Sequence, residues 1–238
     1  MAVTLSDVSF IQKGNGKDLV LMHGYLSCKE TFAAQIAYFS KFYRVTAFDF
    51  LGFGGSKPLT EPFSVADYAA WTREVFSLLG IRKPHIIAHS FGCRVAVKML
   101  AEDNAIADKL LLTGPAGIIR KRGFSYHFKV KSYRVVRRFF PRFAERKFGS
   151  AEYRSLSPVM RESYKKIVNE DLRGDAARIQ NLTLIVEGES DTTTPFDEAK
   201  IYLQSLKNGS LKRMRGGHFA FAEEALLFNL ITEEFLYD

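Results

Sequence analysis

The sequence predicts an α/β fold with a mostly parallel sheet, and three observations lead to this prediction. Short apolar segments alternate with helix-like segments over residues 1–115, and the same alternation resumes over 179–238. Apolar strands that are separated by helices are typical of a sheet covered on both faces. Residues 116–178 carry no strand pattern and have a helical period. We therefore expect one core domain, formed by residues 1–115 and 179–238, and a helical lid over 116–178, inserted after the sixth strand.

The individual elements follow from their periodicity and their end signals. The first strand alternates at period two, whereas the later strands are short apolar runs. Ser64 and Asp67 have the spacing of a capping box at the start of a helix, and Gly80 ends that helix. The expected strands are 7–14, 17–24, 42–50, 85–89, 107–114, 182–187 and 210–214. The expected helices are 31–39, 64–80, 91–103, 195–206 and 223–236.

Composition excludes several classes of protein. No run of about 18 apolar residues is present, so we expect no membrane-spanning helix. The first residues lack the basic and apolar regions of a signal peptide. Cys28 and Cys93 show neither metal-binding nor redox spacing, so we interpret them as free thiols in a reducing compartment. These features together predict a cytoplasmic protein.

The positive charge is concentrated in one segment. Residues 118–147 hold eleven Lys or Arg and one acid, whereas the remainder holds 23 basic and 25 acidic residues. Aromatic and Val residues recur at helical spacing between these charges. We favour a lid whose apolar face covers a site. A weak contact with a membrane surface and recognition of an anionic substrate stay open. We expect no nucleic-acid partner, because no motif for one is present.

Polar residues follow the ends of three expected strands. Ser90 comes after the strand at 85–89, Asp191 ends the segment 182–191, and His218 follows the last strand. Sites in parallel α/β sheets gather at the carboxyl ends of strands. The chain order of serine, acid and histidine is that of one known kind of catalytic triad. Each residue alone has a plainer interpretation: Ser90 as a helix cap and Asp191 as a turn residue.

Five motifs in the same order resemble the α/β-hydrolase superfamily over essentially the whole chain, in particular small lidded esterase-like or lipase-like members. "AHSFG" resembles the nucleophile elbow G-x-S-x-G, with Ala88 in place of the first glycine. The other four are "HGYLS", "DFLGFGGS", "GESDTTTP" and "GGHF", which resemble the oxyanion loop, the D-x-x-G-x-G-x-S stretch, the acid loop and the histidine loop.

The resemblance implies a role for each motif residue. Ser90 is the expected nucleophile, His218 its general base, and Asp191 the acid that orients the histidine. Asp197 is the nearest competing acid, but it lies past Pro195 within an expected helix. The backbone N–H groups of Tyr25 and Phe91 form the expected oxyanion hole.

Further residues beside these motifs are candidates for contact with the substrate. His89, Phe219 and Arg94 are the candidates, although an internal ion pair of Arg94 with Asp49 or Asp67 is the favoured alternative for that residue. His23 is expected to shape the oxyanion loop. Neither a metal nor an organic cofactor is required for this chemistry.

The expected function is hydrolysis of a carboxylic ester or related acyl bond in a small molecule, through an acyl-enzyme intermediate. A second possibility is a lyase or carbon–carbon bond hydrolase that acts on an anionic substrate with the same triad. Ser-x-Gly-x-Arg resembles the elbow of the menaquinone-pathway synthase of succinyl-hydroxycyclohexadiene-carboxylate (SHCHC synthase). A third possibility is a non-catalytic binding protein of this fold, because a fold alone does not determine function. The oligomeric state is left open.

Overall fold

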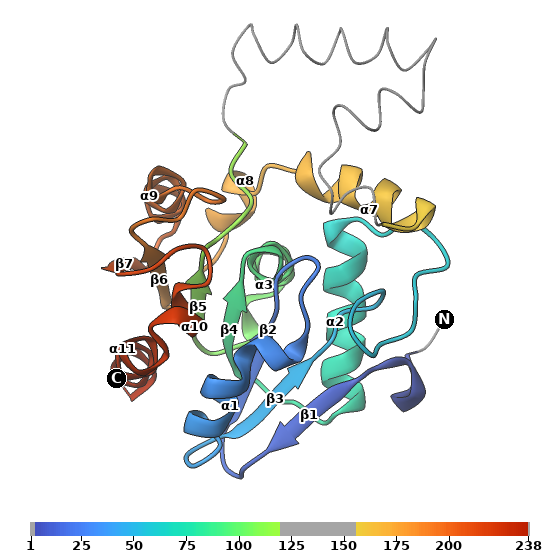
Figure 1. Ribbon diagram of the computed structural model, residues 1–238, viewed down its shortest axis with the longest axis horizontal. Coiled ribbons are helices and arrows are strands. Elements are labelled where there is room, and N and C mark those ends of the chain that lie inside the picture. The colour runs from blue at the N-terminus through green and yellow to red at the C-terminus, as the bar shows by residue number, and fades with distance from the viewer. Residues whose placement is uncertain (1–2, 120–155, 238) are drawn as a thin grey trace, which may run out of the picture.

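A seven-stranded sheet organises the part of the protein that the structure describes (Figure 1). The computed structural model describes residues 3–119 and 156–237. The strands lie in the order β1-β3-β2-β4-β5-β6-β7, and only the pair β1–β3 is antiparallel. The predicted α/β class with a mostly parallel sheet is therefore confirmed.

The strands are short and most are fully buried. They are β1 Phe10–Lys13, β2 Asp18–Met22, β3 Arg44–Phe48, β4 His85–His89, β5 Leu110–Thr113, β6 Thr183–Gly188 and β7 Gly209–Met214. The α-helices are α1 Ala33–Phe39, α2 Val65–Leu78, α3 Phe91–Glu102, α7 Pro158–Val168, α8 Arg173–Ala176, α9 Phe196–Ser205, α10 Ala220–Glu223 and α11 Ala225–Tyr237. Short 3₁₀ helices span Leu5–Asp7, Lys29–Phe32 and Asn104–Ile106.

Helices cover both faces of the sheet, and the strands divide their side chains between two cores. In β4, Ile86 and Ala88 belong to the core that contains side chains of α2 and α3. Ile87 points to the opposite core, together with Phe39 of α1 and Phe228 of α11. This alternation follows from the period-two geometry of a strand, and it explains why the middle strands are apolar throughout.

Helix α2 begins where its sequence signal predicts. The Ser64 hydroxyl accepts a hydrogen bond from the Asp67 N–H at 3.2 Å, and the Asp67 carboxylate accepts from the Ser64 N–H at 2.7 Å. This reciprocal capping box satisfies two backbone donors that a helix start leaves without partners. Gly80, with a φ of 61°, follows the end of the helix.

The expected lid segment follows β5, which is the fifth strand of the part that the structure describes, so its expected place after a sixth strand is wrong. Helices α7 and α8 belong to this segment. The basic and aromatic residues 120–155, including most of the expected amphipathic pattern, lie outside the described residues. The division of the chain into core and lid domains stays a prediction.

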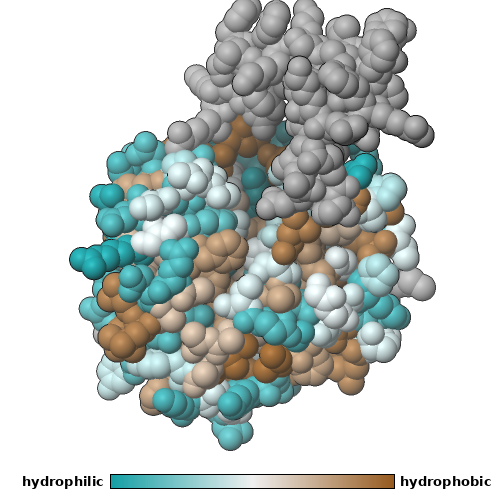
Figure 2. All heavy atoms as spheres, viewed as in Figure 1, coloured by the Kyte–Doolittle hydropathy of each residue, from teal (hydrophilic) through white to brown (hydrophobic). Residues whose placement is uncertain are grey.

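Helix α11 is the most apolar surface helix of the described chain. It buries Phe228 and Leu236 but leaves Leu226, Leu227 and Leu230 exposed. Figure 2 shows a hydrophobic patch at the lower left, in the region where Figure 1 shows α11. Over residues 3–119 and 156–237, no helix combines the length and the apolar character needed to cross a bilayer.

Candidate active site

Ser90 occupies a strained turn between β4 and α3. Its backbone has φ 51° and ψ −105°, in the left-handed half of conformational space that residues other than glycine seldom adopt. The Ser90 N–H donates to the Thr113 carbonyl of β5 at 3.1 Å, which holds the turn against the sheet. Strain of this kind persists only where surrounding structure enforces it, and it is concentrated at functional sites. The turn also places Ser90 at the N-cap of α3, where the helix dipole favours negative charge.

Gly92 permits this turn because α3 begins against the end of β2. A Cβ atom at Gly92 would lie 2.3 Å from the Met22 carbonyl oxygen and 2.9 Å from that of His23. We predict that Gly92→Ala lowers the free energy of unfolding by about 1–3 kcal/mol or prevents folding, because backbone atoms must move to admit the methyl group. Gly174→Ala is the control, since a Cβ there meets no atom within 4 Å. Urea unfolding of both variants tests this prediction, and equal stabilities would contradict it.

Asp191 and His218 form a close pair beside this turn. The His218 Nδ1 atom lies 2.7 Å from Asp191 Oδ2. Asp191 sits in the turn after β6, and His218 follows β7, the neighbouring parallel strand. Burial alone would raise the pKa of Asp191, but hydrogen bonds from His218 and Thr194 outweigh it and hold that pKa well below its ordinary value. The carboxylate therefore stays ionised and orients the imidazole.

Two threonines that sequence analysis did not single out complete the setting of Asp191. The Thr193 and Thr194 N–H groups donate to Asp191 Oδ1 at 2.7 and 2.9 Å. The Thr194 hydroxyl donates to Asp191 Oδ2 at 2.9 Å and lies 3.2 Å from His218 Nδ1. The run "DTTTP" is the signal that predicts this turn, because an Asp side chain commonly accepts from backbone N–H groups two or three residues later.

The expected oxyanion loop lies directly against the Ser90 turn. A Cβ at Gly24 would be 3.4 Å from Ser90 Cβ, so the loop and the nucleophile are in close contact. His23 Nε2 accepts from the Phe50 N–H at 3.0 Å, which leaves Nδ1 to donate to the Gly24 carbonyl at 2.7 Å. Burial lowers the pKa of His23 to about 4, so the ring is neutral. His23 therefore shapes this loop, as expected.

The far end of the same loop is attached to Asp49. The Lys29 N–H and Nζ donate to the Asp49 carboxylate at 2.7 and 2.8 Å, and the Gly55 N–H donates at 2.9 Å. Burial alone would raise the pKa of Asp49, but these contacts hold it below its ordinary value. Asp49 and Gly55 belong to the "DFLGFGGS" stretch, which therefore holds the far end of the expected oxyanion loop in place.

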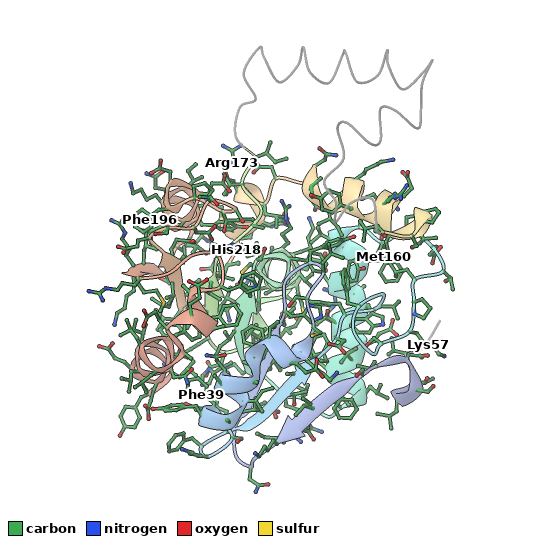
Figure 3. The ribbon with its side chains drawn as sticks, viewed as in Figure 1. Phe39, Lys57, Met160, Arg173, Phe196 and His218 are labelled. Carbon is green, nitrogen blue, oxygen red and sulfur yellow. The ribbon has the colours of Figure 1, made fainter. Side chains whose placement is uncertain are left out.

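A cavity of about 940 Å³ brings most of the expected site residues together. Ser90, His218 and both expected oxyanion residues, Tyr25 and Phe91, line it. Aliphatic side chains of the expected lid segment line another part of it: Ile118, Leu156, Ile167 and Val168. Figure 3 shows His218 and Met160 of α7 in the upper half of the view, on the side of the sheet where α7 lies. Among the described residues, no hydrogen bond joins the Ser90 hydroxyl to the His218 ring, a common feature of sites without substrate.

The three expected substrate contacts have different positions. Phe219 is 42% exposed and lines the cavity. His89 does not line it, contrary to expectation: the ring is buried against His218 and Phe221, and Nε2 lies 2.9 Å from the His218 carbonyl oxygen. Burial and the nearby His218 lower the pKa of His89 to about 3, so the ring is neutral.

Arg94 lines the cavity. The prediction that it pairs with Asp49 or Asp67 is wrong. Its guanidinium donates to the carbonyl oxygens of Ile167 and Glu170 at 2.9 and 2.8 Å. Asp49 instead binds Lys29, and Asp67 caps α2. Arg94 therefore attaches the end of α7 and the residues after it to α3. Burial lowers the pKa of Arg94.

The comparison with protein families agrees with this geometry. The model of the "alpha/beta hydrolase fold" family matches residues 18–157, which is more than half of the chain. The chain belongs to the α/β-hydrolase fold family. Over the part that the structure describes, no group of three or more His, Cys, Asp or Glu residues is arranged to hold a metal ion.

Relatives of this α/β hydrolase cover nearly its whole length. The AB hydrolase superfamily protein YisY of Bacillus subtilis is 24% identical, over 93% of this chain and 92% of its own. An esterase from Exiguobacterium antarcticum has a similar structure, with a TM-score of 0.78 and 20% identity over 97% of this chain and 96% of its own. A meta-cleavage product hydrolase from Pseudomonas fluorescens has a TM-score of 0.74 and 21% identity over 97% and 94%. At these identities the structural likeness shows the fold alone.

Proposed function

We propose that this α/β hydrolase is a serine hydrolase that cleaves a carboxylic ester or related acyl bond. The observation that carries the proposal is the 2.7 Å Asp191–His218 pair, which opens onto the same cavity as the strained Ser90 turn. An ionised acid, an oriented imidazole and a hydroxyl that lines the cavity at a helix start are the components of acyl transfer.

The chemistry proceeds in two halves. His218 Nε2 takes the Ser90 proton as Oγ attacks the acyl carbon, and the same proton then passes to the leaving alcohol. A water molecule, deprotonated by His218, next attacks the acyl-enzyme and releases the acid. The Tyr25 and Phe91 N–H groups stabilise the oxyanion of both tetrahedral intermediates, by about 3 kcal/mol each. Phe91 is the first residue of α3, so its N–H has no acceptor within the helix.

Labelling with a fluorophosphonate tests the nucleophile. The wild type is expected to form a covalent adduct, and Ser90→Ala is expected to form none. Ser27→Ala is the matched control, because Ser27 lines the same cavity while its hydroxyl donates to Thr31. Labelling of Ser90→Ala, or none of a folded wild type, would overturn the proposal and favour a binding protein of this fold.

Turnover of p-nitrophenyl esters from acetate to decanoate then tests the reaction. Hydrolysis by the wild type, lost in Ser90→Ala, supports an esterase. Labelling without turnover of any ester favours the second candidate, a carbon–carbon bond hydrolase or lyase on an anionic substrate. The observation in favour of that candidate is the Arg94 side chain in the cavity wall. The absence of a cofactor, a cytoplasmic location and a weak membrane contact of the basic segment stay predictions.

A further inference from the structure

Helix α7 is attached to the core at several points along its length. The Tyr25 hydroxyl donates to the Met160 carbonyl at 3.1 Å, near the start of the helix. The Ser163 hydroxyl accepts from the Phe63 N–H at 2.8 Å. At the other end, Arg94 donates to the Ile167 carbonyl. One of these attachments therefore comes from a residue of the expected oxyanion loop.

The Tyr25 ring connects α7 to Phe91, the other expected oxyanion residue. It contacts the Tyr164 ring of α7 with centroids 5.2 Å apart, and the Phe91 ring edge-on at 5.5 Å. The Phe53 ring packs against its other side at 4.9 Å. Edge-to-face contacts of this kind are favourable and directional. Tyr25 therefore links the first turn of α7 to the start of α3 through its own side chain.

The loop that contains Tyr25 includes a strained backbone position. Leu26, the next residue, has a φ of 56° and a side chain that is 48% exposed. Hydrogen bonds flank this position on both sides: His23–Gly24 before it, and Ser27–Thr31 and Lys29–Asp49 after it. Backbone strain persists only where the surrounding structure enforces it, and the contacts of the Tyr25 side chain contribute to that restraint.

We infer that α7 positions the oxyanion hole, and that the Tyr25 hydroxyl is the positioning group through which it does so. When α7 is seated, the hydrogen bond to Met160 holds the Tyr25 ring, and the ring holds the backbone N–H in the direction of the developing negative charge. Preorganised donors of this kind act on the transition state more than on the bound substrate. This inference rests on the proposed function.

Tyr68 provides a matched control. Its hydroxyl donates to the Leu51 carbonyl at 3.1 Å, the same length and the same type of acceptor as for Tyr25. Its ring also contacts Phe91, with centroids 5.0 Å apart. Tyr68 lies on α2, outside the oxyanion loop, and does not line the cavity. Tyr25→Phe and Tyr68→Phe thus remove the same atom from equivalent bonds in one aromatic cluster.

The readouts are kcat, KM and the affinity for a trifluoromethyl ketone. Ser90 Oγ adds to the ketone carbon, the hydroxyl proton passes to His218, and the charged hemiketal oxygen occupies the oxyanion hole. Tyr25→Phe is expected to lower kcat about tenfold and to weaken ketone binding by a similar factor, with KM little changed. Tyr68→Phe is expected to leave both kcat and ketone affinity near the wild-type values.

The outcomes separate this inference from the proposed function. If the wild type reacts with the fluorophosphonate at Ser90 and Tyr25→Phe keeps wild-type kcat and ketone affinity, the inference is wrong while the proposed function stands. Equal losses of kcat in both variants also overturn the inference, because they indicate a general loss of packing in the aromatic cluster. A change in KM alone overturns it as well, because it indicates an effect on substrate binding. If wild-type Ser90 does not react, the proposed function itself fails.

Discussion

Asp191→Asn is expected to lower kcat about 10⁴-fold while the protein stays folded. The reason lies in the four donors around this side chain. The Thr193 and Thr194 N–H groups point at Oδ1, so the amide oxygen of asparagine must take that position. The amide NH₂ then faces His218 Nδ1, which must accept rather than donate. The proton of the neutral ring moves to Nε2, where it blocks removal of the Ser90 proton.

Steady-state hydrolysis of a p-nitrophenyl ester measures this effect. Asp197→Asn is the control, because Asp197 is the competing acid of the sequence analysis, lies in α9 and forms an exposed pair with Lys200. We expect that variant to retain wild-type kcat. A loss for Asp197→Asn equal to that for Asp191→Asn would show that the acid has been misassigned, and full activity of Asp191→Asn would remove Asp191 from the mechanism.

Glu187→Gln is expected to stabilise the protein at neutral and alkaline pH. Glu187 lies in β6 and is fully buried, and among the described residues no donor with ordinary hydrogen-bond geometry reaches either carboxyl oxygen. Burial, followed by the neighbouring Asp191 carboxylate, raises the pKa of Glu187 from 4.5 to about 9. The group is therefore protonated in the folded state at neutral pH and ionised in the unfolded state.

The sign of the pH effect follows from this difference. Between pH 4.5 and 9 the folded state binds the proton more tightly than the unfolded state, so wild-type stability falls as the pH rises. At pH 7 the cost is about 3 kcal/mol, from about 1.4 kcal/mol per pH unit above the unfolded pKa. Glutamine has the same shape, stays neutral in both states and avoids this cost. The gain should be small at pH 5 and should grow towards pH 8.

Urea unfolding at several pH values measures the difference in free energy of unfolding between the wild type and Glu187→Gln. The contributions of the other titrating groups are nearly the same in both proteins and largely cancel in this difference. Glu189→Gln is the control, since Glu189 is exposed and lies 3.8 Å from Arg213. Its effect should be below about 1 kcal/mol at every pH. A Glu187→Gln variant that is less stable than the wild type at pH 8 would show that the buried carboxyl is ionised and paired.

The helices, the strands and the residues that follow the strands could be predicted from sequence, because apolar runs and capping residues mark where each element begins and ends. The strand at 85–89 has the predicted bounds, and the Ser64–Asp67 capping box forms as its spacing indicates. The cavity includes Ser90 and His218 because parallel strands end at one edge of a sheet. Buried apolar runs and side-chain capping signals are both visible in a sequence.

The contacts that sequence analysis missed involve backbone carbonyl acceptors, or side chains that only the fold brings together. Neither can be recognised from a sequence. Arg94 carries an obvious charge, but it binds backbone carbonyls, which every residue possesses. His89 precedes Ser90, yet its ring packs against His218 and Phe221 and lies close to Gly24. The carboxyl of Glu187 lies near Asp191 only because the chain turns back at the end of β6.

The attachments of α7 to Tyr25 and Arg94 bear on how substitutions change the cavity wall. In both attachments the acceptors are main-chain oxygens of the expected lid segment, those of Met160, Ile167 and Glu170. A substitution on the insertion changes the side chains that face the cavity but leaves these oxygens in place. Substitution of Ile167 or Val168, which line the cavity, is therefore expected to change the cavity wall without removing these attachments.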